Sequence, residues 1–471
     1  MEMERRSVAY DAEGGDDHER QGTVWTATSH IVAAVVGSGV LALAWTVAQM
    51  GWAVGPLALL GFSCVTYYTS TLLANCYRYP DPVSGTVNRE YIDAVRCYLG
   101  RKNVLLCGCA QYVNLWGTLV GYTITASTSM IAVRRVNCFH ERGYGASGCS
   151  TSGSTFMVIF GLFQLLLSQL PSLHNIAWLS IVAVATSFGY SFISLGLCAA
   201  KWLSSPNHGA IHGTLSGAGS FSGSPETKTF NILLALGNMA FSYTFADVLI
   251  EIQDTLRSTP AENKTMKKAS FYGLAMTTVF YLFLGCTGYA AFGNDAPGNI
   301  LTGFAFYEPF WLVDVANVCV IVHLIGAYQV FAQPIFARVE SYVSGKYPDA
   351  KFINAVYYVR FLPVLPAVPV APMKLVLRTV IIMFTTLVAM LLPFFNAVLG
   401  LIGALGFWPL SVYFPVAMHV ARLKIGRGEG KWWWLQAMSF VCLLISIAAS
   451  IGSVQDIVHN LKTATPFKTV D

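Results

Sequence analysis

Long apolar stretches, separated by short segments rich in charge, proline or glycine, recur along the chain from residue 25 to residue 453. A helix needs roughly 20 apolar residues to cross a hydrocarbon core about 30 Å thick. The pattern therefore predicts an all-α integral membrane protein with about 11 transmembrane helices. The predicted crossings are residues 25–49, 52–76, 105–133, 155–173, 176–200, 230–253, 269–292, 309–339, 375–392, 396–420 and 432–453.

These stretches also divide the chain into parts. Residues 1–24 carry many charges and no apolar periodicity, which predicts a disordered tail. Residues 25–200 hold the first five crossings, and residues 230–422 hold the second five. The polar segment 201–229 is expected to be a loop between them, and residues 423–471 hold the eleventh crossing and a C-terminal tail.

Composition and charge support this prediction and orient the chain. Hydrophobic residues make up 55% of the sequence and charged residues only 11%, against about 25% charged in a soluble domain. With the N-terminus in the cytoplasm, the predicted cytoplasmic segments hold most of the 29 Lys and Arg residues, as cytoplasmic loops do. The C-terminus is then extracellular. The net charge of +5 reflects these loops and does not indicate nucleic-acid binding.

Cysteines fit this orientation. Most of the 11 cysteines lie in predicted crossings, where a thiol acts as a small apolar side chain. Cys138 and Cys149 lie instead in the predicted outer loop between the third and fourth crossings. An oxidising compartment permits a disulfide there, with two unpaired thiols as the alternative.

Two crossings contain interruptions. Residues 37–39 read Gly-Ser-Gly near the middle of the first crossing, and polar groups interrupt the sixth at residues 240–247. Within a bilayer, non-helical backbone is tolerated where it is buried in protein or lines a cavity. Paired interruptions at corresponding positions of two halves are typical of transporters built from inverted repeats, with the substrate site at the breaks. The alternative is that the small residues serve only close helix packing.

Several longer motifs resemble those of the plant amino acid permeases, which belong to the auxin and amino acid permease group of the amino acid/polyamine/organocation superfamily. The resemblance extends from about residue 22 to the C-terminus. The motifs are 28–45 (TSHIVAAVVGSGVLALAW), 66–73 (TYYTSTLL), 110–115 (AQYVNL), 121–126 (GYTITA), 249–257 (LIEIQDTLR), 288–292 (GYAAF), 323–329 (HLIGAYQ), 393–399 (PFFNAVL) and 407–418 (FWPLSVYFPVAM).

This resemblance implies proton-coupled uptake of neutral and acidic amino acids across the plasma membrane. It implies a fold of two inverted five-helix repeats, with crossings one and six broken, plus an eleventh helix. The substrate carboxylate is then expected at the backbone N–H groups of Gly37, Ser38, Gly39 and Val40. The ammonium is expected at carbonyl groups around Ala240, Phe241, Ser242 and Tyr243. The other expected pocket residues are Asn114, Tyr122, Phe245 and Asn317.

Proton coupling requires a group whose charge changes with access to either side, and such groups are rare at membrane depth. His30 and His323 have the residue type suited to this switch, while a neutral imidazole bonded to backbone is the alternative for each. Glu251 and Asp254, at the inner end of the sixth crossing, are candidates for proton carriage or for a gate paired with Arg or Lys. The proton is the expected coupling ion, and no cofactor is expected.

Two residues depart from the pattern of the permeases. Asn238 stands where many of them have Asp, and Asp247 stands where a small or hydroxyl residue is expected. Asp247 is therefore a candidate proton or cation site that changes the substrate range, or a residue paired structurally inside the bundle.

Other functions remain open. One is a carrier of the same fold for another small acid such as auxin, or one driven by sodium. Another is a sensor that binds amino acids without net flux. An enzyme is not expected, because the sequence shows no metal-ligand cluster, nucleophile motif or phosphate-binding loop. The sequence does not indicate an oligomeric state.

Overall fold

The computed structural model describes residues 20–143, 149, 152–169, 177–204, 211–217, 225–304, 307–348, 350–359 and 368–463. Most of the predicted tail 1–24, part of the loop 201–229 and the last residues of the C-terminal tail lie outside these ranges. The division of the chain into the five predicted parts stays a prediction.

The described chain is almost entirely helical. The first half contains α2 (Val24–Val35), η1 (Ser38–Ala42), α3 (Leu43–Ala74), α4 (Tyr91–Leu99), α5 (Arg101–Arg142), α6 (Gly153–Ser168) and α7 (Ala177–Leu203). The second half contains α8 (Pro225–Ser242), η4 (Ala246–Val248), α9 (Leu249–Asp254), α10 (Glu262–Phe292), η5 (Gly293–Asp295), η6 (Ile300–Phe304), α11 (Phe310–Lys346), α12 (Lys351–Asn354), α13 (Pro372–Leu391), α14 (Phe395–Gly406), the π-helical η7 (Phe407–Tyr413), α15 (Phe414–Leu423) and α16 (Gly430–Thr463).

The strands are short and lie outside the long helices. β1 (Arg78–Tyr79) pairs antiparallel with β2 (Thr86–Val87). β3 (Tyr357–Val359) pairs antiparallel with β4 (Val368–Val370). Neither hairpin changes the fold class.

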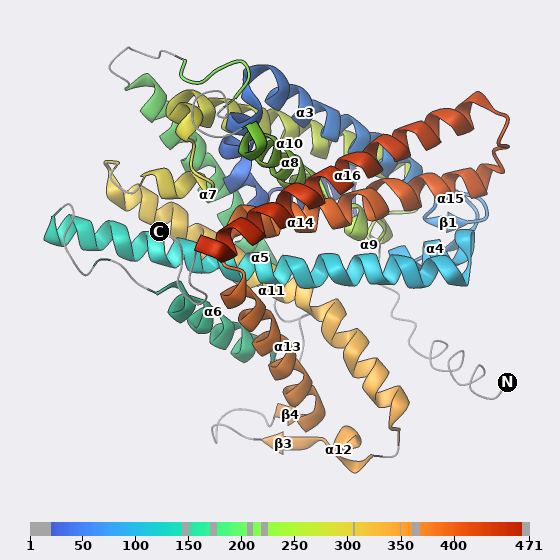
Figure 1. Cartoon of the computed structure of the whole chain (residues 1–471). Helices are drawn as coiled ribbons and strands as arrows, with labels where there is room; N and C mark the ends of the chain where they lie inside the picture. The colour runs from blue at the N-terminus through green and yellow to red at the C-terminus, as the bar shows by residue number, and fades with distance from the viewer. Residues whose placement is uncertain are drawn as a thin grey trace.

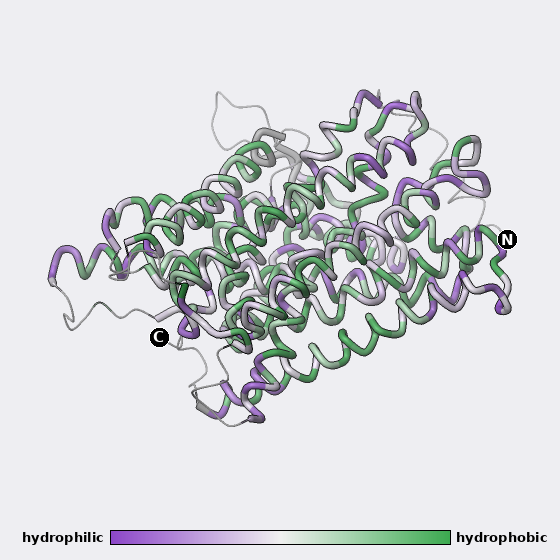
Figure 2. The backbone as a smooth tube through the Cα atoms, turned by 90° about the horizontal axis from the view of Figure 1, so that it is seen from above, coloured by the Kyte–Doolittle hydropathy of each residue, from purple (hydrophilic) through white to green (hydrophobic). Residues whose placement is uncertain are grey.

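Nine helices within the described ranges are long and apolar enough to cross a membrane, and α2 and α6 are shorter apolar helices. Figure 2 shows hydrophilic residues gathered toward the ends of the long helices, with hydrophobic residues along the stretches between. The chain is thus a multi-pass, all-α membrane protein, as predicted. The count of eleven crossings stays a prediction.

Some helices differ in extent from the predicted crossings. Helix α5 extends beyond the predicted 105–133 at both ends, and α6 ends at Ser168, before the predicted residue 173. Hydropathy marks the part of a helix inside the hydrocarbon, whereas backbone hydrogen bonding continues into polar surroundings, which explains why α5 is longer. The first predicted crossing, 25–49, comprises α2, η1 and the start of α3.

A glycine separates the first and second crossings within α3. Gly51 has φ 76° and ψ 179°, and a Cβ at this position would lie 2.4 Å from the Leu215 carbonyl oxygen. Only glycine adopts such a backbone conformation without strain. Gly51 therefore allows the kink within α3.

The two interrupted crossings lie inside the bundle. Helix α10 packs against α2 and α3, and α8 packs against α3, α14 and α16. Figure 1 shows α14 and α16 side by side along one face. The other long helices thus surround the breaks, which is the location where irregular backbone is tolerated in a membrane protein.

Candidate functional site

The first break lies between α2 and η1. Helix α2 ends at Val35, and Gly37 has extended backbone with φ −124° and ψ −151°. The Gly37 N–H donates to the Val35 carbonyl at 2.9 Å, and the Val40 N–H donates to the Gly37 carbonyl at 3.2 Å. Ser38 and Gly39 are the first two residues of η1, so the helix provides no acceptor for their N–H groups. Neither N–H group has a hydrogen-bond acceptor among the residues that the structure describes, so both can donate to an anion.

The second break lies between α8 and α9. Helix α8 ends at Ser242, and Phe245 has φ −141° and ψ 4° before the short turn η4. The Ala240 carbonyl accepts the Tyr243 N–H at 3.2 Å and the Thr244 hydroxyl at 2.7 Å, and the Phe241 carbonyl accepts the Thr244 N–H at 3.2 Å. Several carbonyl groups expected to bind the ammonium are therefore already bonded.

The two breaks face each other. A Cβ placed on Gly39 would lie 2.6 Å from Ser242 Oγ, 3.2 Å from Ser242 Cα and 3.3 Å from a ring carbon of Phe241. The absence of a side chain at Gly39 is what allows η1 and the end of α8 to approach so closely. Residues about 200 positions apart in the sequence thus lie against each other.

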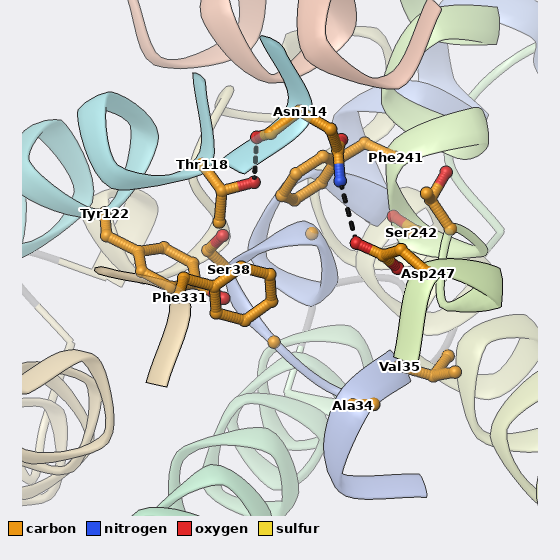
Figure 3. Close-up of a pocket in the computed structure, with 13 residues that line it drawn as sticks. Ala34, Val35, Ser38, Asn114, Thr118, Tyr122, Phe241, Ser242, Asp247 and Phe331 are labelled. Atoms are coloured by element: carbon orange, nitrogen blue, oxygen red, sulfur yellow. Dashed lines mark hydrogen bonds between the residues drawn. The ribbon is translucent and has the colours of Figure 1, made fainter. Parts of the chain in front are cut away.

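A pocket opens beside this junction. Its lining residues come from both breaks and from helices α5 and α11 (Figure 3). They are Ala34, Val35, Gly37, Ser38, Gly39, Asn114, Thr118, Tyr122, Phe241, Ser242, Thr244, Asp247 and Phe331.

Asp247 is the charged residue among those that line the pocket. Its Oδ2 accepts a hydrogen bond from Asn114 Nδ2 at 3.2 Å, and both side chains are buried. Tyr122 and Phe331 lie on another side of the pocket, with ring centroids 5.6 Å apart in an edge-to-face arrangement (Figure 3). The pocket thus has an acidic side chain on one side and aromatic rings on another, and Ser38 and Gly39 of η1 are also part of its lining.

Five other predicted pocket residues do not line this pocket. They are Val40, Ala240, Tyr243, Phe245 and Asn317. Tyr243 and Phe245 are buried, and the Tyr243 hydroxyl donates to Thr278 Oγ1 at 3.2 Å. The Asn317 amide donates to the Val313 carbonyl within α11 at 2.9 Å. These side chains pack inside the bundle. The sequence did not predict this, because periodicity alone does not tell which face of a buried helix borders a cavity.

The predicted proton-coupling histidines lie apart from the pocket lining. His30 is exposed on α2. His323 is buried on α11, and its Nδ1 lies 2.8 Å from the Ala183 carbonyl of α7. Glu251 accepts the backbone N–H of Tyr91 at 3.4 Å, at the first residue of α4.

Asp254 belongs to a set of ion pairs that we call the N-terminal ion-pair network, formed by Arg20, Arg78, Asp254 and Glu262. Arg20 lies 2.7 Å from Asp254 and 3.6 Å from Glu262, and Arg78 lies 2.6 Å from Glu262. Tyr77 donates its hydroxyl to Asp254 at 2.6 Å. Burial, together with this hydrogen bond, raises the pKa of Tyr77 well above its usual range. Tyr77 therefore stays a donor at physiological pH.

Cys138 and Cys149 form a disulfide in this structure.

Asn238 is buried, and neither polar atom of its side chain has a hydrogen-bond partner among the described residues. Asn238 does not line the pocket.

Five lining residues were not among the predicted site residues: Ala34, Val35, Thr118, Thr244 and Phe331. Thr118 lies four residues after Asn114 on the same helix, and its hydroxyl donates to the Asn114 carbonyl at 2.8 Å. This spacing places the two side chains on one helix face, so Asn114 provided a signal for Thr118. Phe331 offered no such signal, because its contact with Tyr122 is made only in the folded bundle.

Comparisons with known proteins indicate the family of this chain. A family model described as "Transmembrane amino acid transporter protein" matches residues 20–459. "Amino acid permease 6" of Arabidopsis thaliana is 51% identical over 98% of this chain and 95% of its own length. "Amino acid permease 1" of the same plant is 52% identical, covering 96% of this chain and 92% of its own length. Both relatives are named as permeases, which are transporters and not enzymes.

A solved structure shares the fold. The inward facing conformation of Mhp1 aligns with a TM-score of 0.50 and 12% identity, covering 95% of this chain and 92% of that chain. At this identity the likeness shows the fold alone. Since the family model and the permeases cover almost the whole chain, the protein belongs to the family of transmembrane amino acid transporters.

Proposed function

We propose that this protein carries amino acids into the cell across the plasma membrane by alternating access, in symport with protons. The observation that carries the proposal is the pocket between the two breaks, which combines free backbone N–H groups with a single acidic side chain. An amino acid zwitterion presents the complementary pair of charges. Membership of the amino acid transporter family supports the same substrate class.

The N–H groups of Ser38 and Gly39 are assigned to the substrate carboxylate. They begin a helix, and the partial positive charge at a helix N-terminus favours an anion. Gly37 and Val40 line or flank the break, but their own N–H groups are bonded to backbone carbonyls. The anion site is therefore narrower than the four residues predicted from the sequence.

Asp247 is assigned to the substrate ammonium. The carbonyl groups of Ala240 and Phe241 already accept hydrogen bonds, whereas Asp247 has an ionisable carboxyl group and faces the pocket. The Asn114 amide donates to Asp247 Oδ2 and holds the carboxylate in place. A charge-assisted hydrogen bond of this kind contributes about 1.5–3 kcal/mol.

The aromatic wall is assigned to the substrate side chain. Tyr122, Phe331 and Phe241 present ring surfaces to the pocket. Such surfaces favour uncharged side chains. The proposal is therefore a carrier of neutral amino acids in the first place, with acidic ones disfavoured by Asp247.

Proton coupling is assigned to Asp247, because it is the ionisable group in contact with the pocket. A symporter must hold proton and substrate together, so the proton is placed on one carboxyl oxygen of Asp247 while the substrate ammonium donates to the other. His323 is the alternative carrier, since it is buried on α11 with a single backbone contact at Nδ1.

Recording currents in oocytes that express the protein tests this function. A panel of amino acids is applied at two external pH values, with and without sodium. The inward currents should be larger at acid pH and should not depend on sodium. Currents that are indifferent to external pH exclude the proton version. Currents with auxin and none with amino acids would identify a carrier of another small acid.

A further inference from the structure

One buried tyrosine connects the two breaks. Tyr281 of α10 is fully buried, and its hydroxyl donates to the Val35 carbonyl at 2.6 Å. The same hydroxyl lies 3.3 Å from the Ser242 carbonyl. Val35 is the last residue of α2 and Ser242 is the last residue of α8. A single oxygen atom thus contacts the C-terminal end of both half-helices.

The packing of α10 places Tyr281 at this position. A Cβ on Gly273 would lie 2.8 Å from Cγ2 of Ile31 in α2, and a Cβ on Gly288 would lie 2.5 Å from Cβ of Ala44 in α3. Gly273, Tyr281 and Gly288 lie on the same side of the helix, since residues seven or eight positions apart are within roughly 80° of each other around its axis. Helix α10 therefore runs along both halves of the broken crossing, with Tyr281 between the two close contacts.

The charge at this junction requires a positive partner. The C-terminal end of each half-helix carries a partial negative charge on its unbonded carbonyl groups. In transporters with broken helices, such carbonyl groups bind the coupling cation. Here the Val35 carbonyl accepts both the Tyr281 hydroxyl and the Gly37 N–H, at 2.9 Å, so both of its lone pairs are used.

We propose that the Tyr281 hydroxyl occupies the place of a sodium ion at the junction of the two breaks and so determines which coupling ion the protein uses. The hydroxyl proton provides the positive end that the two carbonyl groups need. Tyr281 acts as a positioning residue, because it holds the two half-helices and does not line the pocket. The uptake test of this inference rests on the proposed function, whereas the melting test does not.

The test uses Tyr281→Phe, which removes the hydroxyl and leaves the ring. Thermal melting of the purified full chain is compared in about 100 mM sodium chloride and about 100 mM choline chloride. A ligand that binds only the folded state raises the melting midpoint. The wild type should melt at the same temperature in both salts. Tyr281→Phe should melt lower in choline and recover by several degrees in sodium.

Tyr328→Phe is the matched control. Its hydroxyl is also buried and lies 2.9 Å from Thr385 Oγ1, between α11 and α13, away from the breaks. Its melting midpoint should fall equally in both salts. The proposal is overturned if Tyr281→Phe responds to the salts as Tyr328→Phe does, or if sodium stabilises the wild type over choline. The wild-type comparison decides even if Tyr281→Phe yields no folded protein.

Uptake provides a second readout. Wild-type uptake of a neutral amino acid should be equal in the two salts, while Tyr281→Phe should lose several-fold in choline and regain part of it in sodium. Uptake by Tyr281→Phe that equals the wild type in choline contradicts the proposal. A wild type without any uptake contradicts the proposed function instead, and the melting comparison still tests Tyr281.

Discussion

Among single residues, Asp247 provides the most direct test of how the substrate is bound. Asp247→Asn keeps the shape and the contact with Asn114 but removes the charge. Loss of a charge-assisted bond of about 1.5–3 kcal/mol corresponds to roughly a 10- to 100-fold rise in KM for amino acids. The response of uptake to external pH should also flatten. Kinetics of uptake at two pH values measure both effects.

Asp314→Asn is the control for this variant. Asp314 also forms a carboxylate–amide pair, with Asn137 at 2.7 Å, but it does not line the pocket. Its KM should stay within about twofold of the wild type, since changes away from special sites cost little. An unchanged substrate range and pH dependence in Asp247→Asn would show that Asp247 is only a structural partner of Asn114.

Gly39 tests the close approach of the breaks. A methyl group at Gly39 would lie 3.2 Å from Ser242 Cα, which is backbone and cannot rotate away. Overpacking costs about 1–3 kcal/mol, so Gly39→Ala should lower maximal uptake about tenfold while the protein still reaches the membrane. Gly61→Ala, where a Cβ meets nothing within 4 Å, should transport normally. Equal activity of the two variants would argue against a site at this junction.

Much of the pocket lining, but not all of it, could be predicted from the sequence. Gly37, Ser38, Gly39, Phe241 and Ser242 were predicted from the interruptions, and the pocket lining includes them. The predicted pocket positions that do not line it are all buried elsewhere in the bundle. Which face borders the cavity depends on helix rotation, and hydropathy does not report rotation inside a bundle.

At the scale of elements, the N-terminal ion-pair network ties the segment before α2 to β1, α9 and α10. Glu262 is its centre, because it contacts both Arg20 and Arg78 and its side chain is only 2% exposed. Glu262→Gln leaves Arg78 without its carboxylate. Removing one partner of a buried ion pair costs about 3 kcal/mol, so the melting midpoint should fall by several degrees.

Asp93→Asn is the matched comparison for Glu262→Gln. Asp93 pairs with Arg96 at 2.7 Å on the surface of α4, where the Arg96 side chain is 60% exposed. Exposed pairs contribute about 0–1 kcal/mol, so the midpoint should barely move. If the two variants melt alike, the network does not hold these elements together.

Elements differed in how well the sequence predicted them. The long helices could be predicted from length and hydropathy, because a crossing needs about 20 consecutive, mostly apolar residues. Helix α4 and the π-helical η7 did not, because α4 is only nine residues long and η7 differs from an α-helix only in its hydrogen-bond register. The hairpins β1–β2 and β3–β4 were missed because such short strands leave no alternating pattern.

For the whole molecule, orientation in the membrane is the open prediction. With the N-terminus inside, the Cys138–Cys149 disulfide faces the outside. An impermeant maleimide added to intact cells should label these cysteines only after treatment with an impermeant reductant. A variant with both cysteines changed to Ser should lose the reduction-dependent signal. Labelling that needs opened cells would place this loop inside and reverse the orientation.

The central claim is that the pocket between the two breaks moves amino acids together with protons. Purified protein in sodium-free liposomes, given an acid exterior and a labelled neutral amino acid, measures this most directly. The account predicts accumulation above the external concentration that collapses when a protonophore removes the pH gradient. Binding of the amino acid without accumulation would indicate a sensor, and accumulation that persists without the gradient would contradict proton coupling.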